Sequence, residues 1–119
     1  MFNLSIYLMK IGVIGSRDFD NYKLLAETLQ SFNISLIVSG GAMGADALAH
    51  KFAVSNVIPF RVFKPNYQKY GRQGPLVRNS EIVKESDFIL AFWDGKSKGT
   101  FDTICKAKRS GKPYKIVRF

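Results

Sequence analysis

Three short segments of this sequence combine glycine with hydroxyl and charged side chains. They are residues 15–18 (Gly-Ser-Arg-Asp), residues 39–46 (Ser-Gly-Gly-Ala-Met-Gly-Ala-Asp) and residues 93–100 (Trp-Asp-Gly-Lys-Ser-Lys-Gly-Thr). Glycine lets the backbone approach a ligand closely, and the free N–H groups where a loop enters a helix attract phosphate. Each segment alone is equally well explained as an ordinary turn between a strand and a helix. If the strands that precede them form one parallel sheet, the three segments lie at the same edge of that sheet, and together they favour a phosphate-binding site.

Two common nucleotide-binding fingerprints do not fit these segments. Residues 95–97 (Gly-Lys-Ser) resemble the end of a P-loop, but Leu90 occupies the position where that motif requires glycine. The dinucleotide pattern G-x-G-x-x-G is absent after the first expected strand, where Gly12 and Gly15 are the only glycines. The sequence therefore argues against a P-loop NTPase and against an ordinary NAD-dependent dehydrogenase.

Positive charge is concentrated in two stretches of the chain. The 119 residues carry a net charge of +9. Residues 47–80 contain no acid, and residues 96–118 contain eight basic residues against Asp102 alone. Such a field favours polyanions, whether a nucleotide, single-stranded nucleic acid or RNA. For the C-terminal stretch a solvated lysine-rich surface explains the charge equally well.

The reactive side chains indicate no metal site and no cofactor. The one cysteine, Cys105, lies in an expected helix, which favours a buried apolar role over a reactive thiol. The one histidine, His50, follows apolar residues on another expected helix, and we interpret it as structural. The apolar stretch 2–14 is interrupted by polar and basic residues, so it predicts neither a signal peptide nor a membrane span. We expect a cytoplasmic protein.

Strand-like apolar runs alternate with helical patterns, which is typical of repeated βα units and a parallel sheet. The expected strands are residues 8–14, 34–38, 57–63, 88–92 and 114–117. The expected helices are residues 22–32, with Asp20 or Asn21 as the cap, and residues 45–55, 75–85 and 100–110. The predicted fold class is therefore α/β, with about five parallel strands.

The chain predicts one domain over residues 9–119. A hydrophobic share of 46% is enough for one core without a disulfide or a metal. Residues 9–15 (Met-Lys-Ile-Gly-Val-Ile-Gly) resemble a natural chain start that leads into the first buried strand. Residues 1–8 fit the pattern poorly, and we interpret them as an N-terminal extension.

The ordered set of motifs resembles the SLOG superfamily, most closely its YspA-like branch of small stand-alone domains. The matching residues are 14–19, 38–49, Tyr70-Gly71, Arg78-Asn79 and 91–100. Each motif alone is weak, whereas their order along residues 9–119 is specific. The resemblance implies a three-layer Rossmann-like fold, with helices on both faces of the sheet, that holds a nucleotide or an ADP-ribose-type molecule over the second and fourth loops.

The resemblance also assigns roles to particular residues. It implies that the second loop cradles phosphate through Ser39, Gly40, Gly41 and Gly44, and that Gly99 and Thr100 supply a second set of donors. Arg78 would grip phosphate or carboxylate, or else pair with Glu81 or Glu85 at the surface. Ser16 and Arg17 would close one side of the site. The other candidates in the matching motifs are Gly15, Asn79, Asp94, Gly95 and Ser97.

Two further candidate residues, Asp46 and Trp93, each have two alternative roles. A carboxylate repels phosphate, so Asp46 contacts ribose hydroxyls or a base, or else caps the second helix. Trp93 stacks on a base or covers the end of the sheet.

The resemblance implies a binding module for a small nucleotide-derived ligand such as an ADP-ribose derivative or a cyclic nucleotide signal. Such a module would act as a sensor or sequestering protein, of phage or anti-phage origin, and a homodimer is expected. The related LONELY GUY phosphoribohydrolases need a glutamate where this chain has Thr103, which argues against N-glycosidic hydrolysis unless one of four aspartates substitutes. These aspartates are Asp18, Asp46, Asp94 and Asp102. The related DNA-processing protein DprA makes single-stranded DNA the alternative partner.

Overall fold

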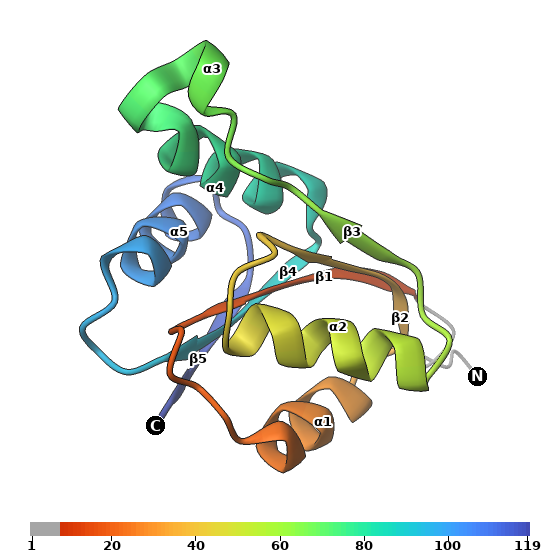
Figure 1. Cartoon of the computed structure of the whole chain (residues 1–119). Coiled ribbons are helices and arrows are strands. Elements are labelled where there is room, and N and C mark those ends of the chain that lie inside the picture. The colour runs from red at the N-terminus through yellow and green to blue at the C-terminus, as the bar shows by residue number, and fades with distance from the viewer. Residues whose placement is uncertain (1–7) are drawn as a thin grey trace.

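The computed structural model describes residues 8–119, which form a five-stranded sheet (Figure 1). Its strands are β1 (Met9–Gly15), β2 (Ile34–Ser39), β3 (Phe60–Val62), β4 (Phe88–Trp93) and β5 (Tyr114–Arg118). Their order across the sheet is β3-β2-β1-β4-β5, and every neighbouring pair is parallel. The prediction of about five parallel strands is confirmed.

Helices cover both faces of this sheet, so the predicted three-layer arrangement is also confirmed (Figure 1). Side chains of α1 (Tyr22–Gln30) and α2 (Ala45–Ser55) pack on one face, and those of α4 (Gly74–Glu85) and α5 (Lys98–Arg109) pack on the other. Successive strand residues point to opposite faces. In β1, Val13 therefore joins the first core and Ile14 the second.

Helices α1 and α5 begin where a side chain satisfies one of their first N–H groups. Of the two predicted caps for α1, Asn21 is the one used, and its Oδ1 accepts a hydrogen bond of 3.0 Å from Leu24 N. The last helix begins at Lys98, two residues before the predicted start, because Ser97 is its cap. The bounds of α2 coincide with the predicted residues 45–55.

The chain between α2 and α4 differs most from the prediction. The expected strand 57–63 shrinks to β3, because Val57 has a φ of +54° in the turn that follows α2. After β3 comes a short helix, α3 (Tyr67–Tyr70), and a 3₁₀ turn, Gly71–Gln73, neither of which the sequence indicated. Figure 1 shows α3 standing beyond the sheet, at the N-terminal end of α4.

The proposed N-terminal extension falls almost entirely on residues 1–7, which lie outside the described residues. Leu8 is described and exposed, and β1 starts at the next residue. Within residues 8–119, no helix is both long and apolar enough to cross a membrane.

Candidate functional site

A cleft of about 600 Å³ lies at the carboxyl ends of the strands. It is bordered by the loops after β1, β2 and β3, and by the N-terminal halves of α4 and α5. Proteins with an open parallel sheet bind ligands at this edge, beside the strand from which the chain runs first to one side of the sheet and then to the other. In the strand order β3-β2-β1-β4-β5 that strand is β1. The predicted site residues that line the cleft are Gly15, Arg17, Gly40, Gly41, Asp46, Arg78, Asn79, Ser97, Gly99 and Thr100.

The amides of the second loop are occupied by a carboxylate of the protein itself. Asp46 is 6% exposed, and its Oδ2 accepts hydrogen bonds from Gly40 N (3.1 Å) and Ala42 N (3.0 Å). The alternative in which Asp46 caps α2 is therefore wrong, because the N-cap of this helix is Gly44 and no side chain makes a cap bond there. The carboxylate closes the loop that precedes the helix.

Burial dominates the electrostatics of Asp46. Desolvation raises the pKa of this carboxyl, although the amides of Ala42 and Gly40 and the charge of Arg78 act in the opposite direction. Its second oxygen, Oδ1, takes no part in the two amide bonds. Asp46 lines the cleft, and Oδ1 is the carboxylate oxygen that these amide bonds do not use.

Gly44 holds two loops together and does not line the cleft. It has a φ of +76°, and a Cβ atom there would lie 2.4 Å from Ser16 O and 2.6 Å from Arg17 O. Any side chain would therefore push the β1–α1 loop away. The glycine is required by contact between loops, rather than by the approach of phosphate to the position itself.

Arg78 points from α4 toward the second loop. Its Nη1 donates to Gly40 O at 2.9 Å and to Phe63 O at 3.4 Å, and its Nε donates to Asn79 Oδ1 at 3.0 Å. The alternative ion pair with Glu81 or Glu85 is not formed among the described residues, where Glu85 pairs with Lys10 and Arg61. The guanidinium is thus fixed at the wall of the cleft, and Nη2 takes no part in these bonds.

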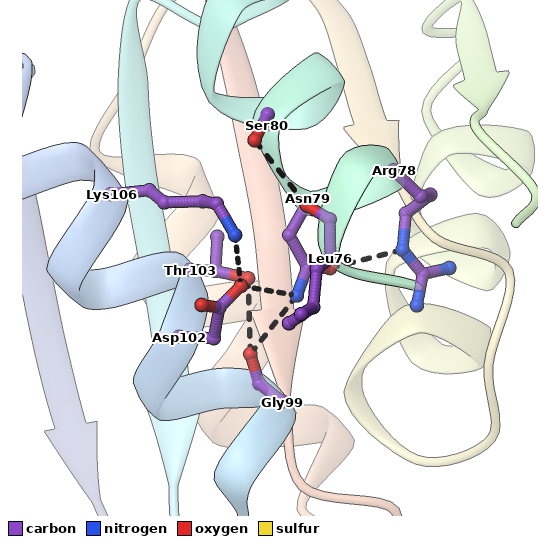
Figure 2. Close-up of polar contacts among 8 residues, drawn as sticks. All are labelled: Leu76, Arg78, Asn79, Ser80, Gly99, Asp102, Thr103 and Lys106. Atoms are coloured by element: carbon purple, nitrogen blue, oxygen red, sulfur yellow. Dashed lines mark hydrogen bonds and ion pairs between the residues drawn. The ribbon is translucent and has the colours of Figure 1, made fainter. Parts of the chain in front are cut away.

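A chain of hydrogen bonds extends from Arg78 to α5 (Figure 2). Asn79 accepts from Arg78, and its Nδ2 donates to Asp102 Oδ2 at 3.0 Å and to Gly99 O at 3.4 Å. Asp102 in turn accepts from Lys106 Nζ at 2.5 Å. Asp102 is therefore committed to positioning α5 against α4, a role that residue types alone did not indicate.

The N-terminus of α5 opens onto the same cleft. Ser97 caps the helix, and the first i to i−4 bond runs from Phe101 N to Ser97 O, so the amides of Lys98 and Gly99 have no partner within the helix. A Cβ atom at Gly99 would meet nothing within 4 Å. Thr103, at the position where phosphoribohydrolases need glutamate, lines the cleft and donates its hydroxyl to Gly99 O at 3.1 Å.

Six of the predicted site residues do not line the cleft. They are Ser16, Ser39, Gly44, Trp93, Asp94 and Gly95. Several of them instead hold the loops in place. Ser16 is buried, and its Oγ accepts from Asp94 N at 3.1 Å, which joins the first loop to the fourth. Asp94 accepts from Ser97 N and Lys96 N, and these amides lower the pKa of its carboxyl.

Trp93 is the last residue of β4 and packs against the second core. Its Nε1 donates to Ser97 O at 3.0 Å, its ring stacks on Phe101 at 5.7 Å, and Arg118 lies over it at 5.4 Å. Both the polar tip and the ring are engaged by the protein.

The β3–α4 connection adds residues that sequence reasoning missed. Lys64, Pro65 and Tyr67 line the cleft from this side, and Pro75 does so from the start of α4. With Lys64, the described part of the chain lines the cleft with three cations, Arg17, Lys64 and Arg78, against the single acid Asp46. The acid-free stretch 47–80 was the available signal for Lys64. Among residues 8–119, no three His, Cys, Asp or Glu side chains gather in a way that would hold a metal ion.

Comparison with known proteins agrees with the resemblance drawn from the motifs. Residues 9–70 match the family described as "YspA, cpYpsA-related SLOG family". The Gene 61 protein of Mycobacterium phage D29 is 30% identical over 124 residues, which cover 94% of this chain and 97% of the phage protein.

Two solved structures share the fold. The DNA processing protein A of Helicobacter pylori, described for its single-stranded DNA binding mode, superposes with a TM-score of 0.70 at 22% identity. The DNA processing protein A (DprA) of Streptococcus pneumoniae superposes with a TM-score of 0.76 at 18% identity. The matches cover 91% and 94% of this chain, but only 64% and 51% of those longer chains.

Proposed function

The chain belongs to the YspA and cpYpsA-related SLOG family, and we propose that it binds a small phosphate-bearing nucleotide or nucleotide-derived ligand in the cleft. In this proposal the phosphate lies between Arg78 and the N-terminus of α5. The ligand is held as a signal or is sequestered.

The observation that carries the proposal is the convergence of donors on one cleft. Arg17, Lys64 and Arg78 contribute positive charge, and the amides of Lys98 and Gly99, which have no partner within the helix, add the positive end of a twelve-residue helix. The second loop does not use the Gly40 and Ala42 amides for this purpose, since Asp46 already accepts from both. We therefore place phosphate nearer to α5 than the glycine-rich sequence of the second loop suggests.

The second carboxylate oxygen of Asp46, which the two amide bonds do not use, supports a ligand that also carries hydroxyl groups. An ionised carboxylate accepts hydrogen bonds, so Oδ1 suits a ribose hydroxyl or the N–H of a base. The same charge would repel a phosphate placed against it. A sugar phosphate with its hydroxyls toward α2 and its phosphate toward α5 satisfies both requirements.

Binding is favoured over N-glycosidic hydrolysis. Thr103 supplies a hydroxyl where the reaction needs a carboxylate, and Asp102 is bonded to Asn79 and Lys106. Of the four aspartates considered, Asp46 alone lines the cleft, and one of its oxygens holds two amides.

Single-stranded nucleic acid is the second candidate. The net charge of +9 is larger than the binding of a mononucleotide requires. The structural likeness to two DNA processing proteins is a second reason to test binding of single-stranded DNA. These relatives are longer and below 25% identical, so we place DNA second.

The two candidates differ in their response to salt. We expect mononucleotides or ADP-ribose at 100 times their dissociation constant to stabilise the fold by about 2.7 kcal/mol, with little loss at physiological salt. For single-stranded DNA, each neutralised phosphate should contribute a slope of about −0.7 in log affinity against log salt. Thermal unfolding with a ligand panel, and oligonucleotide titrations at several salt concentrations, decide between them. Tight, steeply salt-dependent oligonucleotide binding without any nucleotide shift would replace the pocket proposal.

A further inference from the structure

We infer that the ring of Tyr67 is the platform on which the base of the ligand stacks, so that the cleft takes nucleotides in preference to sugar phosphates without a base. This inference rests on the proposed function and adds a base subsite to it. Nothing in the sequence singled out Tyr67.

Tyr67 is an exposed aromatic residue at the edge of a cationic cleft. It lines the cleft and is 62% exposed, so the protein leaves most of its surface uncovered. Pro65 and Pro75 line the cleft beside it. Aromatic faces that are accessible next to positive charge stack nucleobases, while the charge meets the phosphate.

No other aromatic ring is available for this purpose among the described residues. Of residues 8–119, Tyr67 is the single aromatic residue that lines the cleft. Trp93, the aromatic residue that the sequence favoured, is bonded to Ser97 and in contact with Phe101 and Arg118. If a base stacks on the protein inside the cleft, Tyr67 is where it does so.

The backbone that carries Tyr67 is held on both sides. Asn66 caps α3, because its Oδ1 accepts from Lys69 N at 3.0 Å, and its carbonyl accepts from Tyr70 N at 3.1 Å. At Gly74, a Cβ atom would lie 3.3 Å from the Asn66 backbone, which shows how closely α4 approaches this turn. A platform held in this way loses little conformational entropy on binding.

Along the cleft wall, the charged side chains of Arg78 and Lys64 are followed by the apolar surfaces of Pro65 and Tyr67. Arg78 Nη1 reaches the carbonyls of Gly40 and Phe63, and the chain then continues through Lys64 and Pro65 to Tyr67. A phosphate that contacts Arg78 and α5 can therefore place its base toward α3. This order distinguishes a nucleotide from a bare phosphate ligand.

The experiment compares AMP, UMP and ribose 5-phosphate by calorimetry at physiological salt. The proteins are the full chain, Tyr67→Ala, Tyr67→Phe and the control Tyr70→Ala, which alters the same short helix outside the cleft. We expect Tyr67→Ala to weaken AMP binding by roughly 5- to 150-fold, the range found when a base loses its stacking partner. The loss for UMP should be smaller, because a pyrimidine overlaps less of the ring. Tyr67→Phe keeps the ring and should bind AMP like the full chain, as should Tyr70→Ala.

Ribose 5-phosphate separates this inference from the proposed function. Its affinity should be the same for all four proteins within about twofold, because it carries no base. If AMP and ribose 5-phosphate bind the full chain equally, or if Tyr67→Ala leaves AMP unchanged, the stacking role is wrong and the phosphate site stands. If none of the three ligands binds the full chain, the proposed function fails and the base subsite fails with it.

Discussion

Asn79 donates a hydrogen bond of 3.0 Å to Asp102, and this bond joins α4 to α5 beside the cleft (Figure 2). Asn79 is 5% exposed and also contacts Arg78 and Gly99, so one amide side chain links a predicted ligand-binding cation to the helix terminus opposite it. The spacing between the two proposed phosphate contacts, Arg78 and the N-terminus of α5, therefore depends on a residue that need not touch phosphate.

Replacing Asn79 should damage stability and binding together. We expect Asn79→Ala to lower the free energy of unfolding by about 2 kcal/mol, since it leaves partly buried partners without their hydrogen bonds. Affinity for AMP should fall as well, because Arg78 loses the acceptor of its Nε. Denaturant unfolding and calorimetry measure the two effects.

The neighbouring Ser80→Ala provides the control for Asn79. Ser80 is exposed, and its hydroxyl donates only to Leu76 O within α4 (Figure 2). Its replacement should change stability by no more than about 0.5 kcal/mol and leave affinity unaltered. Equal effects of the two substitutions would mean that the Asn79 bonds do not position the site.

Gly99→Ala should move stability and affinity in opposite directions. A methyl group there meets no protein atom within 4 Å, and alanine favours a helix over glycine, so we expect a gain of about 0.5 kcal/mol in unfolding free energy. The same methyl group stands next to the free amides of α5 and should weaken AMP at least about tenfold by obstructing close approach of phosphate. A variant that is more stable and binds AMP normally would move the phosphate away from α5.

The fold and the site differed in how far the sequence could predict them. Strands such as 88–92 were predicted because a buried parallel strand appears as one apolar run. The four-residue helix α3 is too short to show a helical period, so Tyr67 could not be placed at the cleft.

Side-chain partners were the least predictable part of the site. The amides that Asp46 binds belong to Gly40 and Ala42, and residue types do not reveal backbone partners. Glycine-rich loops were located correctly, yet Gly44 proved to serve contact with the first loop. The expected dimer and the cytoplasmic location stay predictions.

The pH dependence of stability should reveal the buried carboxyl of Asp46. Its pKa is raised in the folded protein, so protonation favours folding, and stability from this group increases as the pH falls through the folded pKa toward the unfolded value of 3.8. Asp46→Asn keeps an oxygen for the Gly40 and Ala42 amides but cannot titrate. The stability of the wild-type protein relative to this variant should therefore rise on acidification.

Comparing the wild-type protein with Asp46→Asn cancels the contributions of the other carboxyl groups to the pH dependence of stability, because both proteins contain them. Asp94, whose pKa is lowered, contributes stability above its unfolded pKa that is lost as the pH falls through its folded pKa, but it does so in both proteins. Unfolding curves at several pH values give the difference directly. A difference that stays constant between pH 7 and 4 would show that burial does not control Asp46.

Arg78 offers the most direct test of the phosphate contact. Arg78→Ala removes a fixed guanidinium from the cleft and should weaken AMP by about 2 kcal/mol, the scale of a lost hydrogen bond to a charged group. Stability should fall by about 1 kcal/mol too, because Arg78 also bonds Gly40 O and Asn79. Arg78→Lys retains the charge but not the planar fork, so it should recover only part of the affinity. Calorimetry with AMP at low and physiological salt, beside denaturant unfolding of each variant, separates the two contributions. If both variants lose stability while their affinity for AMP equals that of the unaltered chain, Arg78 supports the second loop and the phosphate lies elsewhere.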